Sequence, residues 1–216
     1  MTNMLADVAT GVCWGIIVLE WVAGGVYNAL HPRGERTRTR NLQWQLVVIG
    51  VAVACAIIVV ITRAALDHLT VTASWARVLG LVVLAGSAAF TLWARIALGT
   101  MWSMGATVKN AHQLRTTGPY GVTRHPIYTG LLGMLVGTTL LNEAGQWIIL
   151  FPVGLILLEL KIHAEERLFL DFFPGDYQWY RRQVPQIVPG LYIFRRCPAG
   201  QLISRAPRDT QRGRPG

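Results

Sequence analysis

Long apolar runs separated by short polar segments dominate the chain. Five runs contain mainly aliphatic, aromatic and small residues: 8–30, 42–62, 74–98, 126–141 and 146–163. A helix that crosses a bilayer needs about 20 apolar residues, and the last two runs, joined only by the link 142–145, approach that length. The pattern predicts an all-α, polytopic membrane helix bundle of about five transmembrane helices that ends in a helical hairpin.

The chain divides into three parts by composition. Residues 1–98 contain three of the apolar runs and few polar groups that could carry chemistry, so they are predicted to form a transmembrane scaffold. The first run has no basic segment before it and no small-residue cleavage site, which predicts an anchor and not a cleaved signal. Residues 195–216 are rich in Arg, Pro and Gly, which predicts a disordered basic tail. The region 99–194 remains as the candidate for function.

Basic residues gather in alternate polar segments. Residues 31–41 hold four arginines, 99–125 hold one lysine and two arginines, and the chain from Arg167 onward holds nine arginines, whereas 64–73 and 142–145 hold no Lys or Arg. Positively charged segments stay on the cytosolic side of a membrane. The N-terminus is therefore predicted to face out, and the C-terminus and every polar cluster to face the cytosol.

Composition limits the class of protein. With 52% hydrophobic and 14% charged residues, a soluble domain would have too few polar residues for its surface. The net charge is +9, and the basic residues lie in the segments next to the apolar runs. This placement favours anionic lipid headgroups over nucleic acid as partners. Cys13, Cys55 and Cys197 have no metal-site or disulfide spacing, and no metal site is predicted.

Candidate chemistry begins just before the fourth apolar run. Gly118-Pro119 is a turn signal, and Pro126 suits the first turn of a helix, where its missing N–H costs nothing. Arg124 and His125 are thus predicted at a helix N-terminus, whose free N–H groups and partial positive charge favour an anion. The alternative is an interfacial anchor made of basic and aromatic residues.

A second cluster closes the fifth run. It contains Glu159, Lys161, His163, Glu165, Glu166 and Arg167. Lys161 and Glu165 are four residues apart and share one helical face, as in an ordinary solvated ion pair. Because the two runs form one hairpin, this end is also predicted to meet Arg124 and His125 in one polar pocket. The aromatic segment that follows, 168–189, is predicted to lie at the cytosolic interface and to cover the pocket.

The ordered motifs resemble the isoprenylcysteine carboxyl methyltransferases and the related phospholipid methyltransferases. The shared pattern comprises His112-Gln113-Leu114, the turn Gly118-Pro119-Tyr120, Arg124-His125-Pro126-Ile127-Tyr128, the pair Glu165-Glu166, Phe173 with Tyr177 and Tyr180, and Val184-Pro185. One such motif is a weak signal, but the set in this order across about 90 residues is specific. The resemblance implies an integral membrane methyltransferase that uses S-adenosylmethionine and a lipophilic small-molecule or lipid substrate, with a carboxylate as the favoured acceptor group.

The resemblance also implies roles for individual residues. S-adenosylmethionine is expected to be held by His112, Gln113, Leu114, Arg115, Tyr120, His125, Pro126, Ile127, Tyr128 and Glu165. Arg124 and Lys161 are expected to orient the acceptor, although the family commonly has Arg at the position of Lys161 and a lysine lacks the bidentate fork for a carboxylate. A carboxylate acceptor needs no general base; an amine or hydroxyl would need one, for which His125 and Glu166 are candidates.

Two other functions remain open on the sequence. A membrane reductase of the steroid or sterol type also combines several spans with cytosolic polar ends, and it would use NADPH. A non-enzymic scaffold or transporter-like bundle would use Arg124 and Lys161 only as an anion site. A metal-dependent desaturase is disfavoured because His112, His125 and His163 do not form closely spaced histidine boxes.

Overall fold

The computed structural model describes residues 2–30, 73–99, 114–142 and 147–188, and all regular structure within them is helical. The elements are α1 (Thr2–Leu30), α3 (Ser74–Leu98), the short 3₁₀ helix η2 (Gly118–Gly121), α4 (Pro126–Leu141), α5 (Trp147–Phe172) and α6 (Pro174–Gln183). The predicted all-α bundle is confirmed. The predicted span 42–62 and the tail 195–216 lie outside the described residues.

Two helices are long and apolar enough to cross a membrane, Met4–Tyr27 within α1 and Ser74–Leu98. Only 11% and 28% of their most apolar stretches are buried, whereas the core helix of a soluble protein is mostly buried. Their outer faces carry large exposed apolar side chains, including Leu19 on α1 and Ile96 on α3. Such extensive apolar surface is suited to lipid and not to water.

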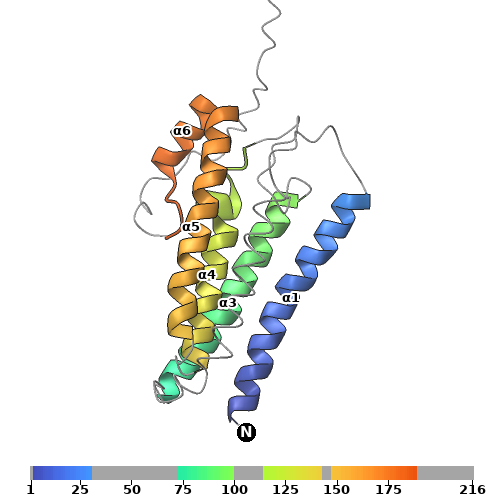
Figure 1. Cartoon of the computed structure of the whole chain (residues 1–216), viewed down its shortest axis with the longest axis vertical. Coiled ribbons are helices and arrows are strands. Elements are labelled where there is room, and N and C mark those ends of the chain that lie inside the picture. The colour runs from blue at the N-terminus through green and yellow to red at the C-terminus, as the bar shows by residue number, and fades with distance from the viewer. Residues whose placement is uncertain (1, 31–72, 100–113, 143–146, 189–216) are drawn as a thin grey trace, which may run out of the picture.

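The bundle is arranged so that its polar elements share one end. α1, α3 and α5 run in one direction and α4 runs in the opposite one (Figure 1). The start of α4 and the end of α5 therefore lie at the same end of the bundle, with α6 beside them (Figure 1). This is the hairpin predicted from the two last apolar runs.

The closest pair of helices is α3 and α4, and small residues make the approach possible. A Cβ atom added to Gly80 of α3 would lie 2.6 Å from the backbone N of Leu141, and one added to Gly137 of α4 would lie 2.5 Å from the backbone N of Leu84. No real side chain tolerates such distances. Helices in lipid commonly associate through small residues in this way, because van der Waals packing replaces the hydrophobic effect there.

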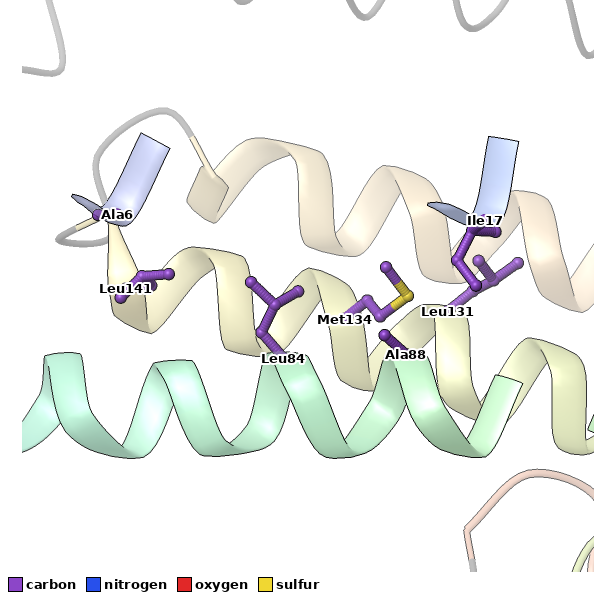
Figure 2. Packing of buried hydrophobic residues seen from close by; sticks show 7 residues of the cluster. All are labelled: Ala6, Ile17, Leu84, Ala88, Leu131, Met134 and Leu141. Carbon is purple, nitrogen blue, oxygen red and sulfur yellow. The ribbon is translucent and has the colours of Figure 1, made fainter. Parts of the chain in front are cut away.

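Apolar side chains fill the seam between these helices and α1. Figure 2 shows Leu84 and Ala88 of α3 beside Met134 of α4, with Ile17 of α1 reaching toward Leu131. α1 is also tied by two hydrogen bonds, from Nε1 of Trp14 to Oγ1 of Thr138 at 3.1 Å and from Nδ2 of Asn142 to Oγ1 of Thr10 at 3.2 Å. The first helix thus packs across both α3 and α4.

The fifth helix is longer than the apolar pattern predicts, since α5 continues past residue 163 to Phe172. Beyond the apolar run, the charged residues of α5 contact residues at the start of α4. Phe169 and Leu170 of α5 pack against α6 and the segment after it, at Tyr177, Tyr180 and Val184. Pro174 then ends the helix, because the residue before a proline is disfavoured in the helical conformation. The predicted interfacial segment consequently comprises the end of α5 and all of α6.

The tight seam gives a test of the bundle. Gly137→Ala is expected to lower the thermal midpoint of the purified protein, because overpacking commonly costs about 1–3 kcal/mol and exceeds the gain in helix propensity of about 1 kcal/mol. Gly86→Ala on α3 is the matched control, because nothing lies within 4 Å of its added Cβ. Circular dichroism in maltoside micelles measures both, and equal midpoints for the two variants would contradict the close approach.

Candidate functional site

The start of α4 is built as the sequence predicts, with His125 as the residue before the helix and Pro126 in its first turn. The segment that follows α6 runs beside it. Three hydrogen bonds join the two: the N–H of Arg124 donates to the carbonyl of Pro185 (2.8 Å), the N–H of His125 to that of Gln186 (3.2 Å), and Oγ1 of Thr129 to that of Ile187 (2.7 Å). The two amides that precede the helix are therefore engaged, and the anion site predicted at the N–H groups of the first helical turn stays a prediction.

The carboxylate of Glu166 joins three elements at this end of the bundle. Its Oε1 lies 2.5 Å from Nη1 of Arg124 and 3.4 Å from Nε2 of His125, and its Oε2 lies 3.5 Å from Nε of Arg181 on α6. The side chains of Glu166 and Arg124 are only 11% and 8% exposed. A buried carboxylate needs such partners, because an unpaired one would be strongly destabilising.

The same contacts set the ionisation of Glu166, which lies beyond the predicted span. Burial raises the pKa of its carboxyl, but the hydrogen bond with His125 and the charges of Arg124, His125 and Arg181 outweigh burial, so the pKa lies below its ordinary value. Burial, with the neighbouring charge of Glu166, conversely raises the pKa of Tyr177. Glu166 is thus held as an anion at neutral pH.

Glu165 has different partners from its neighbour. The hydroxyl of Tyr128 donates to its Oε1 at 2.6 Å, and Nζ of Lys161 lies 3.4 Å from the same oxygen, as the i,i+4 spacing predicts. Its Oε2 lies 3.8 Å from Nδ1 of His125, whose ring stacks on that of Tyr128 with centroids 5.7 Å apart. Glu165 is 18% exposed and Lys161 31% exposed, so this pair is more accessible than the pair of Glu166 and Arg124.

Tyr120 lies in η2 and borders the same cluster. Its side chain is buried, and its carbonyl accepts a hydrogen bond from the hydroxyl of Tyr180 at 2.5 Å. Burial raises the pKa of Tyr120, and the charge of Glu165 raises it further, while Arg95 and Arg115 act in the opposite sense. The phenol is therefore neutral and is available as a hydrogen-bonding and stacking group.

The described structure brings half of the predicted site residues together. Tyr120, Arg124, His125, Tyr128, Lys161 and Glu165 form one cluster where α4 begins and α5 ends. The side chain of Ile127 packs against the core and Leu114 against the α6 cluster, while Arg115 is exposed. His112 and Gln113 lie outside the described residues. Within the described ranges, no group of three or more His, Cys, Asp or Glu side chains is arranged to hold a metal ion.

Two features were missed by sequence reasoning. The first is the network around Glu166, for which the only signal was its place in the Glu-Glu pair. The second is an ion pair between Glu20 of α1 and Arg95 of α3, with Oε1 and Nε 2.9 Å apart. Its signal was the presence of charged residues inside two apolar runs, Glu20 in the first and Arg77 and Arg95 in the third, because such residues mark positions of interest in a membrane protein.

An apolar cavity of about 290 Å³ is separate from this cluster. It is lined by Val136, Thr139, Leu140 and Phe151, in the second half of α4 and the early part of α5. Its polar side chain, Thr139, donates to the carbonyl of Leu135 on its own helix. The cavity therefore brings no further chemistry to the candidate site.

The Glu166 network predicts a pH-dependent contribution to stability. Because folding lowers the pKa of Glu166 below 4.5, its contribution is full above that pH and is lost as the pH falls through the folded value. Glu166→Gln is expected to destabilise the protein by about 3 kcal/mol at pH 7, and the difference from wild type should shrink toward pH 3.

Thermal unfolding in maltoside micelles from pH 7 downward measures this difference. Glu159→Gln is the control on the same helix, because its carboxylate is 38% exposed and is expected to contribute less than about 1 kcal/mol. A difference between wild type and Glu166→Gln that stays constant with pH would show that the ionised carboxylate is not what stabilises the site.

Comparison with known proteins agrees with this geometry. Residues 75–174, a little under half of the chain, match the phospholipid methyltransferase family. The protein-S-isoprenylcysteine O-methyltransferase of Schizosaccharomyces pombe is 33% identical over 81 residues, which cover 36% of this chain and 34% of that protein. Methanethiol S-methyltransferase 2 of Bradyrhizobium diazoefficiens is 33% identical over 87 residues, 40% of this chain and 33% of that one. The chain thus spans about a third of the length of these relatives.

The fold is also similar to a solved structure. The eukaryotic intramembrane Ras methyltransferase ICMT (isoprenylcysteine carboxyl methyltransferase) superposes with a TM-score of 0.59 and 20% sequence identity, covering 88% of this chain and 68% of that one. This likeness concerns the fold. Together with the family match it confirms the resemblance predicted from the motifs: from α3 to the start of α6, this chain is similar to phospholipid methyltransferases and isoprenylcysteine carboxyl methyltransferases.

Proposed function

We propose that the chain is an integral membrane enzyme that transfers a methyl group from S-adenosylmethionine to a lipophilic acceptor. The observation that carries the proposal is the accessible carboxylate of Glu165, flanked by Tyr128, Lys161 and His125. Its location within the segment that matches a methyltransferase family supports it. The similar proteins include an O-methyltransferase and an S-methyltransferase.

The donor set of the site fits S-adenosylmethionine. Glu165 is suited to bind the ammonium of the cofactor, because a charge-assisted hydrogen bond to a carboxylate is among the strongest that a protein offers. The rings of Tyr120, Tyr128 and His125 offer flat faces for an adenine or for the cationic sulfur. The other residues that the motifs predict to hold the cofactor are His112, Gln113, Leu114, Arg115, Pro126 and Ile127.

When bound, S-adenosylmethionine supplies an electrophilic methyl group on a sulfonium. The chain's residues would then align the acceptor with that methyl group and exclude water, which are the main sources of acceleration in such a transfer. Glu165 and the tyrosines would position the donor, and Lys161 would orient the acceptor. Arg124 is predicted to touch the acceptor too; with its guanidinium held by Glu166, we assign it to positioning His125 and α4.

The site is also proposed to face the cytosol, with the N-terminus outside. The charge bias of the polar segments supports this orientation. The lipophilic acceptor would then reach the site from the surrounding bilayer, through a gap between helices. α6 and the segment after it lie beside the start of α4, where they would shield the reacting groups from water.

Cofactor binding tests the function. Isothermal titration of the purified protein in maltoside micelles is expected to show binding of S-adenosylmethionine that Glu165→Gln weakens at least about tenfold, as loss of a charged hydrogen bond commonly does. Glu159→Gln, six residues away on α5, should leave binding unchanged. Absence of binding, or binding unaffected by Glu165→Ala and His125→Ala, would overturn the proposal, and stabilisation by NADPH instead would favour a reductase.

Product analysis then separates an enzyme from a scaffold. Membranes that contain the protein are incubated with S-adenosylmethionine labelled in its methyl group, and the lipid extract is resolved by chromatography. A labelled lipophilic product is expected with the wild-type protein and should be strongly reduced with Glu165→Gln. No labelled product in any extract, despite cofactor binding, would favour the non-enzymic alternative.

Orientation is tested by chemical labelling. The natural cysteines are changed to serine, and a single cysteine is introduced at Gly175. This position of α6 is exposed and has no neighbour near an added Cβ. Labelling of intact cells with a membrane-impermeant maleimide is expected to fail and to succeed only after permeabilisation. Labelling of intact cells would reverse the proposed orientation.

A further inference from the structure

The ion pair between Lys161 and Glu165 is accessible to a ligand at the candidate site. Both residues lie on one face of α5, four positions apart, with Nζ of Lys161 3.4 Å from Oε1 of Glu165. Their side chains are 31% and 18% exposed, whereas Arg124, which pairs with Glu166, is only 8% exposed. A ligand that reaches this end of the bundle can therefore meet a positive and a negative charge side by side.

Glu165 is held in place by contacts that do not depend on Lys161. The hydroxyl of Tyr128 donates to its Oε1 at 2.6 Å, and its Oε2 lies 3.8 Å from Nδ1 of His125. An ionised carboxylate has about four lone-pair positions, so it can accept a further hydrogen bond beside that of Tyr128. Glu165 would consequently keep its position when Lys161 moves away from it.

The amino acid end of S-adenosylmethionine carries two opposite charges close together. Its ammonium nitrogen and its carboxylate group are attached to the same carbon atom, which places nitrogen and oxygen about 3 Å apart. Lys161 and Glu165 present the complementary charges at a similar separation of 3.4 Å. An ammonium bound to Glu165 therefore brings the carboxylate of the same ligand within reach of Lys161.

The balance of charge favours the same arrangement. When an ammonium binds Glu165, Lys161 loses its partner unless a second anion arrives with the ligand. The carboxylate of the cofactor supplies that anion, and lysine can follow it because its ammonium is a compact charge on a flexible stem. A lysine also has three N–H donors, so its remaining donors can still face the acceptor.

We propose that Lys161 and Glu165 together bind the amino acid group of S-adenosylmethionine, with Glu165 binding the ammonium and Lys161 the carboxylate. This inference rests on the proposed function and adds Lys161 to the residues that hold the cofactor. Its consequence is selectivity for the complete cofactor over a form without the carboxylate.

Two other interpretations make different predictions. In the first, Lys161 contacts only the acceptor, as the resemblance implies. In the second, Arg115 binds the carboxylate of the cofactor, since it is exposed and its charge acts on Tyr120. The ion pair places the charge of Lys161 directly beside Glu165, where the ammonium would bind, and this favours Lys161 over Arg115.

The experiment compares S-adenosylmethionine with decarboxylated S-adenosylmethionine, which keeps the ammonium and the sulfonium and lacks the carboxylate. Both dissociation constants are measured by isothermal titration into the purified protein in maltoside micelles at pH 7. Wild type is compared with Lys161→Gln, Lys161→Arg and Arg115→Gln. Arg167→Gln is the matched control, because it removes one positive charge from an exposed position of the same helix.

Wild type is expected to bind S-adenosylmethionine about tenfold or more tightly than the decarboxylated form, the effect of one charged hydrogen bond. Lys161→Gln should bring the two constants close together by weakening the binding of the complete cofactor. Lys161→Arg should restore the difference, because a guanidinium also binds a carboxylate. Arg167→Gln should bind both ligands as wild type does, and Arg115→Gln should keep the difference whatever its effect on both affinities.

Other outcomes overturn the inference. Equal constants in wild type, or a difference that persists in Lys161→Gln, would leave Lys161 to the acceptor alone. Loss of the difference in Arg115→Gln but not in Lys161→Gln would assign the carboxylate to Arg115. Either result, combined with binding of S-adenosylmethionine and a labelled product, would leave the proposed function intact. Binding of neither ligand would overturn the proposed function and the inference together.

Discussion

The buried carboxylate of Glu166 is the contact on which the arrangement of the site depends. It lies on α5, yet its partners come from the start of α4 and from α6. A charge this far from water must be compensated, so the fold is stable only when Arg124, His125 and Arg181 converge on it. The position of the His125 ring, and through it that of Tyr128, follows from this requirement.

The platform beneath the site is rigid for a different reason. Glycines let α3 and α4 approach until a single added methyl group would meet backbone atoms, which excludes sliding of one helix on the other. The contacts of α1 with α3 and α4 that the described residues show include apolar packing, two hydrogen bonds and an ion pair. The pair of α3 and α4 positions η2 and the start of α4 at the site. α1 contributes the charge of Glu20, which pairs with Arg95 of α3.

Features that depend on neighbours in the sequence were predicted well. The bounds of α3 and α4, Pro126 in the first turn and the contact of Lys161 with Glu165 all follow from apolar length, turn chemistry and helical spacing. Features that depend on which faces of two distant helices contact each other were predicted less well. The sequence predicts Arg124 and the Glu165-Glu166 pair in one pocket, but a local pattern does not show which glutamate, more than forty positions away, meets the guanidinium. The role of Arg124 toward the acceptor stays a prediction.

Neighbouring positions on a helix point about 100° apart, and this explains why two adjacent glutamates behave differently. Glu166 faces Arg124, whose side chain is only 8% exposed, so its charge is compensated by a buried partner. Glu165 faces Lys161, which is 31% exposed, much more than Arg124, and which can be exchanged. A ligand with an ammonium group can replace Lys161 on Glu165 without leaving a buried charge alone, whereas none can replace Arg124 on Glu166. A ligand can therefore exchange at Glu165 without a change of fold, because Glu166 holds the helices in place.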